Sequence, residues 1–170
     1  MPADSLIPRP PVAAAFVLVS GLGVLGVPGI TGVPAAWAQP PLVGEWHWNP
    51  AESSAAPSQP REVVLVITAG EPARVAWTLT GIDARGQSHV HAYRGTGDGK
   101  PAPVEGAPEG TVAAFTVTGD RMTASYDNRD GSTSRTTCQV DAAHRRLVCE
   151  GTDRDAAGVT TRFRDIYDRR

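Results

Sequence analysis

The chain has little excess charge and no motif that names a reaction. Sixteen Lys and Arg residues stand against 18 Asp and Glu residues, which leaves a formal charge of −2 at pH 7. A balance so close to zero gives no reason to expect nucleic acid or an anionic membrane as a partner. The sequence contains no P-loop, no Gly-x-Ser-x-Gly nucleophile elbow and no Cys/His nucleophile arrangement. The residues therefore imply no cofactor, and an enzyme is the least favoured class.

Cysteine is almost absent, since Cys138 and Cys149 are the only two. An even count in an exported domain favours a disulfide. The two residues flank a predicted hairpin turn at Asp141–Arg145. A loop of even length would place them opposite each other, whereas a three-residue loop with a bulge would offset them by one position. We predict the bridge; two separate buried cysteines are the alternative.

Long apolar runs are lacking except near the start of the chain. Residues 12–27 carry no charge and consist mostly of Ala, Val, Leu and Gly, and Ala36-Trp37-Ala38 follows as a small-residue cleavage pattern. This order predicts a signal peptide over residues 1–38, cut before Gln39. An uncleaved membrane anchor is the alternative.

Cleavage would leave an exported product, periplasmic or secreted, with no membrane span. Residues 39–41 form a short proline-rich lead-in, and residues 42–168 are long enough for one domain of common size.

The mature sequence also lacks any amphipathic helix of length. Asn49-Pro50-Ala51-Glu52 predicts one helical turn at most. Short segments with alternating or β-branched character follow one another, with Gly, Asp and Asn between them. They are residues 42–48, 61–69, 74–80, 87–94, 111–118, 121–127, 132–140, 146–151 and 159–167. Residues 95–110 are expected to be a loop, with at most a short strand near Val104. The pattern predicts an all-β fold, a single antiparallel up-and-down β-barrel of about eight or nine short strands.

Three short motifs resemble one family. Gly44-Glu45-Trp46 opens the first strand, residues 80–87 form a Gly-x-Asp-x-x-Gly hairpin, and residues 150–168 end the chain in a similar way. Together they resemble the small exported bacterial lipocalin-like domains, which are calycin-type barrels of uncharacterised function. The resemblance implies a barrel closed by its first and last strands, and it implies no activity.

The same resemblance suggests structural roles. In lipocalins proper the tryptophan of the Gly-x-Trp motif lies across the closed end of the barrel, and an arginine near the last strand packs on it. Gly44 and Trp46 match the first part, and either Arg162 or Arg164 is expected to supply the arginine through cation–π stacking. The Thr-Asp-Tyr signature of lipocalins is absent from the sequence.

Ligand-binding residues can be proposed only from the strand faces. The predicted strands hold few large apolar side chains for a barrel of this size, which leaves room for a cavity. Trp77, His91, Tyr93 and Tyr126 are expected to line it, with a plainly packed core as the alternative. Asp165 shares a face with Phe163 and Tyr167 and is expected to be solvated.

The strand faces also suggest a metal site. His89 and His91 share one strand face, and two imidazoles on one face can bind a metal if a third ligand is near. His47 is the distant candidate for that ligand, and two histidines without metal are the alternative.

The sequence thus predicts an exported barrel that binds a small apolar or amphipathic molecule and has no catalytic residues. The alternative is a periplasmic protein-binding module, such as an inhibitor of a secreted enzyme, that acts through the mature N-terminus at Gln39-Pro40-Pro41.

Overall fold

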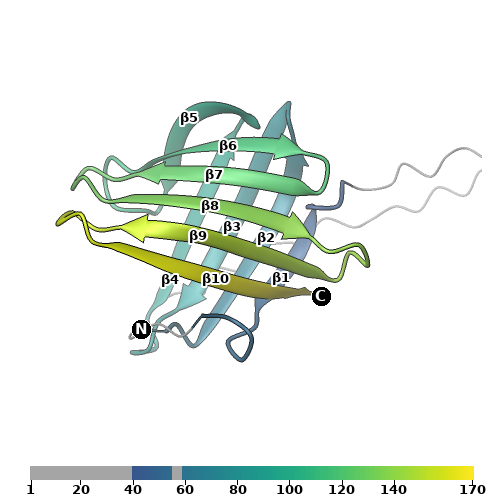
Figure 1. The fold of residues 1–170 in the computed structure, drawn as a ribbon, viewed down its shortest axis with the longest axis horizontal. Coiled ribbons are helices and arrows are strands. Elements are labelled where there is room, and N and C mark those ends of the chain that lie inside the picture. Colours follow the sequence, from purple (N-terminus) through teal and green to yellow (C-terminus); the bar gives the residue numbers. More distant parts are fainter. Residues whose placement is uncertain (1–39, 55–58) are drawn as a thin grey trace, which may run out of the picture. The chain divides into compact units, whose positions relative to one another are not determined.

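Ten β-strands and no helix make up the part of the chain that the structure describes (Figure 1). The structure is a computed structural model, and it describes residues 40–54 and 59–170. The predicted signal peptide and Gln39 lie outside these residues. The strands are β1 Gly44–Trp48, β2 Glu62–Glu71, β3 Arg74–Ile82, β4 Ser88–Gly95, β5 Asp98–Glu105, β6 Val112–Thr118, β7 Arg121–Asp127, β8 Thr133–Val140, β9 Arg146–Arg154 and β10 Thr160–Arg169. No helix suited to crossing a membrane occurs among the described residues.

Each strand pairs antiparallel with its neighbours in the chain, and β1 pairs with β10 to close a barrel. The closing register sets Trp46 opposite Arg169 and Trp48 opposite Tyr167. Figure 1 shows β6–β10 crossing in front of the paler β2–β4, with the end of β10 beside β1. The prediction of an antiparallel barrel closed by its first and last strands is confirmed.

The predicted number of eight or nine strands is wrong, because residues 98–105 form the strand β5. This strand pairs only briefly with β4, through Ala92–Glu105 and Tyr93–Val104, and its register with β6 shifts between Asp98 and Pro101. Two prolines, Pro101 and Pro103, remove backbone N–H donors from the segment. The composition of residues 98–105 therefore predicts a loop, but the segment forms the strand that joins β4 to β6 in the closed barrel.

The core follows from the alternation of side chains along each strand. Apolar residues at every second position point into the barrel, and the fully buried ones gather toward the end where β1 begins and β10 finishes. The largest of them include Trp46, Leu42, Ile67, Leu147 and Val140. We call this end, occupied by Leu42 and Trp46, the closed end. At the opposite end the inward positions are more polar, and the barrel is open there.

A turn after β1 extends the pairing along β10. The predicted helical turn is present as a single hydrogen-bonded turn, in which Ser53 N donates to Asn49 O at 3.1 Å. The hydroxyls of Ser53 and Ser54 then accept the backbone N–H groups of Ile166 and Arg164 at 2.9 and 2.8 Å. These contacts satisfy the part of β10 that the short strand β1 does not reach.

The disulfide between Cys138 and Cys149 is present, as predicted. The two residues lie directly opposite each other on β8 and β9, with Cα atoms 4.0 Å apart. The hairpin turn has the even length that this pairing requires, since Asp141 N donates to Arg146 O at 2.9 Å. Both cysteines are buried in the barrel core, so the bridge faces the interior.

Candidate ligand-binding cavity

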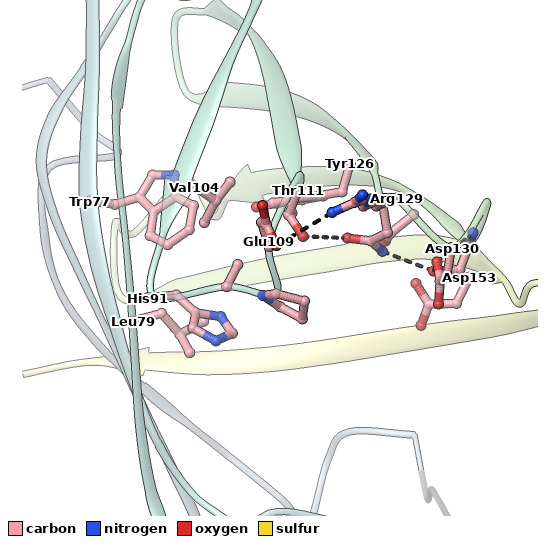
Figure 2. A pocket seen from close by; sticks show the side chains of 15 residues that line it. Trp77, Leu79, His91, Val104, Glu109, Thr111, Tyr126, Arg129, Asp130 and Asp153 are labelled. Atoms are coloured by element: carbon pink, nitrogen blue, oxygen red, sulfur yellow. Dashed lines mark hydrogen bonds and ion pairs between the residues drawn. The ribbon is translucent and has the colours of Figure 1, made fainter.

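A cavity of about 950 Å³ occupies the open end of the barrel (Figure 2). Its apolar wall consists of Trp77 and Leu79 on β3, Val104 on β5 and Tyr126 on β7. The other lining residues are Ala107, Pro108, Glu109, Thr111, Asn128, Arg129, Asp130, Ser132, Ser134, Asp153 and His91. We call this space the outer chamber. Its volume lies at the upper end of the range of small-molecule sites, about 300–1,000 Å³.

An aromatic cluster supports the apolar wall. The rings of Trp77 and Tyr93 stack with centroids 6.0 Å apart, and Tyr93 contacts Phe115 at 4.5 Å. Phe115 in turn meets the edge of Tyr126, with centroids 5.9 Å apart. Gly95 makes this arrangement possible, because a Cβ there would lie 2.3 Å from the Tyr93 hydroxyl. The wall is therefore held by rings packed on rings, and its shape is fixed before any ligand arrives.

Two turns form the polar rim of the outer chamber. Thr111, just before β6, donates its hydroxyl to Asn128 Oδ1 at 2.8 Å, and Asn128 Nδ2 donates to Ser132 Oγ at 3.0 Å. Arg129 and Glu109 form an exposed ion pair at 3.4 Å across the same gap. Figure 2 shows these contacts as dashed lines beside the Trp77 wall. The rim is thus tied together by hydrogen bonds between segments that lie far apart in the sequence.

His91 lies on the wall of the outer chamber. Burial is the main reason that its pKa is lowered, and His89 adds a repulsive charge, so the neutral imidazole is favoured there. His89 lies outside the chamber, exposed, with its Nε2 3.6 Å from Asp83 Oδ2. His47 pairs instead with Glu45 at 2.6 Å. Among the described residues no three His, Cys, Asp or Glu side chains are grouped to hold a metal.

A smaller space of about 110 Å³, the inner chamber, lies deeper in the barrel. It shares Trp77, Leu79 and Tyr126 with the outer chamber. The other residues around it are Leu65, Phe115, Met122, Ala124, Thr136, Cys138, Cys149, Phe163, Asp165 and Tyr167. The disulfide thus lines the space that the barrel encloses.

Asp165 is half-buried, which corrects the expectation of a solvated side chain. Its Oδ1 accepts a hydrogen bond from Trp48 Nε1 at 3.1 Å. Burial raises the pKa of Asp165, an effect that the Trp48 hydrogen bond opposes and the like charge of Asp153 reinforces. The sequence could have indicated this position, because Asp165 alternates with Phe163 and Tyr167, both of which face inward.

Two buried polar atoms of the aromatic cluster, Trp77 Nε1 and the Tyr93 hydroxyl, have no hydrogen-bond partner among the residues that the structure describes. Trp77 is only 6% exposed and lines both chambers. A buried donor without an acceptor costs about 1–3 kcal/mol. The apolar wall therefore carries one hydrogen-bond donor whose need is unmet by the protein.

The structure brings three of the four predicted ligand-binding residues together. Trp77, His91 and Tyr126 line the outer chamber, whereas Tyr93 is fully buried behind Trp77. Sequence reasoning missed Leu79, although it alternates with Trp77 on the same strand. It also missed the rim residues, because turns that meet only through the barrel leave no pattern in the sequence.

The closed end shows which arginine packs on Trp46. The guanidinium of Arg169 lies over the indole, 4.1 Å from the ring centroid, so the expectation of Arg162 or Arg164 is wrong. Arg162 is exposed, and Arg164 pairs with Glu150 at 3.0 Å. Both lie nearer the open end of β10, because the strand runs two residues past the predicted end at position 167.

Gly44 gives Arg169 room at the closed end. A Cβ at Gly44 would lie 2.8 Å from Arg169 Nη1. With the glycine in place, Arg169 donates to Val43 O at 2.9 Å and also to Pro41 O. Trp46 Nε1 donates to Leu42 O at 3.0 Å. These contacts fix the lead-in against the barrel.

The fold and this cavity define a class: a ten-stranded, closed antiparallel β-barrel with one sealed end and one open chamber. No protein-family model matches the chain, and no curated protein matches it. Among solved structures the chain is similar to EF1p2_mFAP2b bound to DFHBI, at 9% sequence identity, over 76% of this chain and 94% of that one, with a TM-score of 0.44. A likeness of this size carries no argument about function.

Proposed function

We propose that this protein is an exported, lipocalin-like barrel that binds one small amphipathic molecule in the outer chamber. The observation that carries the proposal is the chamber itself, about 950 Å³ in volume, with an apolar wall and a polar rim. Sites for small molecules combine these same elements, an apolar lining and a few placed polar groups. In this proposal Trp77 and Tyr126 contact the apolar part of the ligand and His91 contacts its polar part, while Tyr93 supports Trp77 from behind.

The closed end supports the lipocalin-like part of the proposal. A tryptophan from a Gly-x-Trp motif lies there under an arginine of the last strand, as in lipocalins proper. The strand number departs from the family, since lipocalins have eight strands and this barrel has ten.

The lead-in weighs against an inhibitor that acts through its mature N-terminus. Pro40 O accepts a hydrogen bond from Val43 N at 2.9 Å, and Leu42 is 0% exposed. A segment held in this way is not free to enter the cleft of a partner enzyme. The open chamber and the fixed lead-in both favour the ligand-binding function.

A displacement assay with a matched pair of variants tests the proposal. The probe is N-phenyl-1-naphthylamine, a neutral apolar dye whose fluorescence rises on burial. Ala107→Trp puts an indole into the outer chamber, and Ala142→Trp makes the same change in the exposed turn at the closed end. We expect the wild type and A142W to bind the dye alike, and A107W to lose at least about ten-fold in affinity, or about 1.4 kcal/mol. Absence of dye binding to the wild type, or equal binding by A107W, would refute the proposal.

Export is supported by the buried disulfide, which persists in oxidising compartments, and by the leader pattern of residues 1–38. Mass spectrometry of the protein recovered from the envelope and the medium of its host tests this part. We expect a mature chain that begins at Gln39. A chain that retains residues 1–38 would contradict it.

A further inference from the structure

Among the residues that the structure describes, Asp165 is the one charged side chain that lines the inner chamber. It comes from β10, with the inward-facing rings of Phe163 and Tyr167 on either side of it along the strand. Cys149 lies opposite it on β9. A carboxylate thus stands in a mostly apolar and aromatic space that shares three lining residues with the outer chamber.

The protein gives this carboxylate one hydrogen bond and no cation. Trp48 Nε1 is its donor, at 3.1 Å. Among the described residues no Lys, Arg or His nitrogen lies within 4.0 Å of it, and the charge that acts on it from β9 is that of Asp153, which has the same sign. A buried carboxylate is costly unless it is paired. Asp165 is half-buried, so a positive partner would offset the part of its hydration that burial removes.

The surroundings of Asp165 suit a cation. Trp48, Phe163 and Tyr167 line one groove together with Asp165, and aromatic rings attract ammonium groups. Arg162 and Asp153 line the same groove and offset each other in charge. The outer chamber is acidic in sum, since Glu109, Asp130 and Asp153 outnumber Arg129. An acidic opening raises the local concentration of cations.

From these contacts we propose that the ligand is an organic amine: its cationic nitrogen enters the inner chamber and pairs with Asp165, while its apolar body fills the outer chamber against Trp77, Leu79 and Tyr126. This inference rests on the proposed function, because it names the class of ligand for the same cavity. The inner chamber, at about 110 Å³, admits a head group but not a whole amphiphile.

Three probes that differ only in the head group test the inference: octylamine, octan-1-ol and octanoate. Each displaces N-phenyl-1-naphthylamine from the wild type at pH 7, where the amine is protonated. We expect octylamine to bind at least about ten-fold more tightly than octan-1-ol, and octanoate to bind more weakly than the alcohol.

Asp165→Asn is the deciding variant, because it keeps the shape of the side chain and an acceptor for Trp48. We expect D165N to bring octylamine and octan-1-ol within about two-fold of each other, because most of the lost affinity is that of the amine. Asp127→Asn is the matched control, since Asp127 is exposed at the same end of the barrel, 3.7 Å from Arg135, and does not line either chamber.

The outcomes separate the two proposals. If the wild type binds octan-1-ol and octylamine equally, or if D165N keeps the amine preference, the inference is refuted and the cavity remains a binding site. If no probe displaces the dye and A107W has no effect on it, the proposed function fails as well.

Discussion

Opening the disulfide should remove a large share of the stability of the barrel. Cys138 and Cys149 are separated by 11 positions in the sequence, so the bridge closes a loop of about 12 residues in the unfolded chain. The chain-entropy relation gives about 3 kcal/mol of stabilisation for a loop of this length. Reduction of the wild type should therefore lower the free energy of unfolding by about 3 kcal/mol.

A variant without sulfur should lose more than reduction does. Both cysteines are about 95% buried and line the inner chamber. Cys138→Ala/Cys149→Ala removes the bridge and also deletes two buried sulfur atoms, which should cost about 1–2 kcal/mol beyond the loss of the bridge. We expect a total loss of about 4–5 kcal/mol for this variant.

Urea unfolding followed by tryptophan fluorescence measures both losses. The wild type is compared with and without reductant, and the double-alanine variant serves as the control, since reductant should not change its midpoint. A reduced wild type within about 1 kcal/mol of the oxidised protein would refute the reasoning. That result would mean that the β8–β9 hairpin is already closed in the unfolded ensemble.

Three further predictions follow from single side chains. Arg169→Ala should cost about 2–3 kcal/mol, because it removes the stacking on Trp46 and the bonds to two carbonyl oxygens; urea unfolding measures it, and Arg162→Ala, on the exposed face, should stay within about 0.5 kcal/mol. Tyr93→Phe should stabilise the protein by about 1 kcal/mol, since it removes a buried hydroxyl without a partner; a loss of stability would show that this hydroxyl is bonded in solution. Asp165→Asn should raise the melting temperature at pH 7. The pKa of Asp165 is raised in the folded state, so the folded state binds this proton more tightly than the unfolded state does. Ionisation of Asp165 therefore destabilises the fold: the loss of stability is complete above the folded-state pKa and disappears as the pH falls below the unfolded-state pKa. A difference in melting temperature between the wild type and D165N that is as large at pH 3 as at pH 7 would contradict this prediction.

Most of the barrel could be predicted because its strands alternate. Along Arg74–Ile82, for example, the inward residues Val75, Trp77 and Leu79 take every second position, and this pattern is independent of the partner strand. The segment 98–105 has no such pattern, because Gly99 and two prolines interrupt it. It forms a strand because the barrel is closed, and a closed barrel leaves no strand edge unpaired.

The site could be predicted only in part, for a related reason. The face of a strand is local information, and it placed Trp77 and Tyr126 in one cavity. The rim depends on residues 106–111 and 128–132 meeting across the opening, which is a property of strand order and tilt. The arginine over Trp46 depends on where β10 ends, and strand ends are set by pairing with β1 more than by the residues themselves.

The bond from Arg169 to Pro41 brings the two ends of the described barrel together, at the base opposite the chamber. A strand of ten residues spans about 33 Å, so the opening near Thr160 lies a full barrel length from this junction. A fluorescent protein, a surface tether or an affinity handle attached after Arg170 would consequently project away from the opening. The barrel can be immobilised in one orientation with its chamber unobstructed, and a linker across the junction would yield permuted chains whose new ends lie in turns outside the rim.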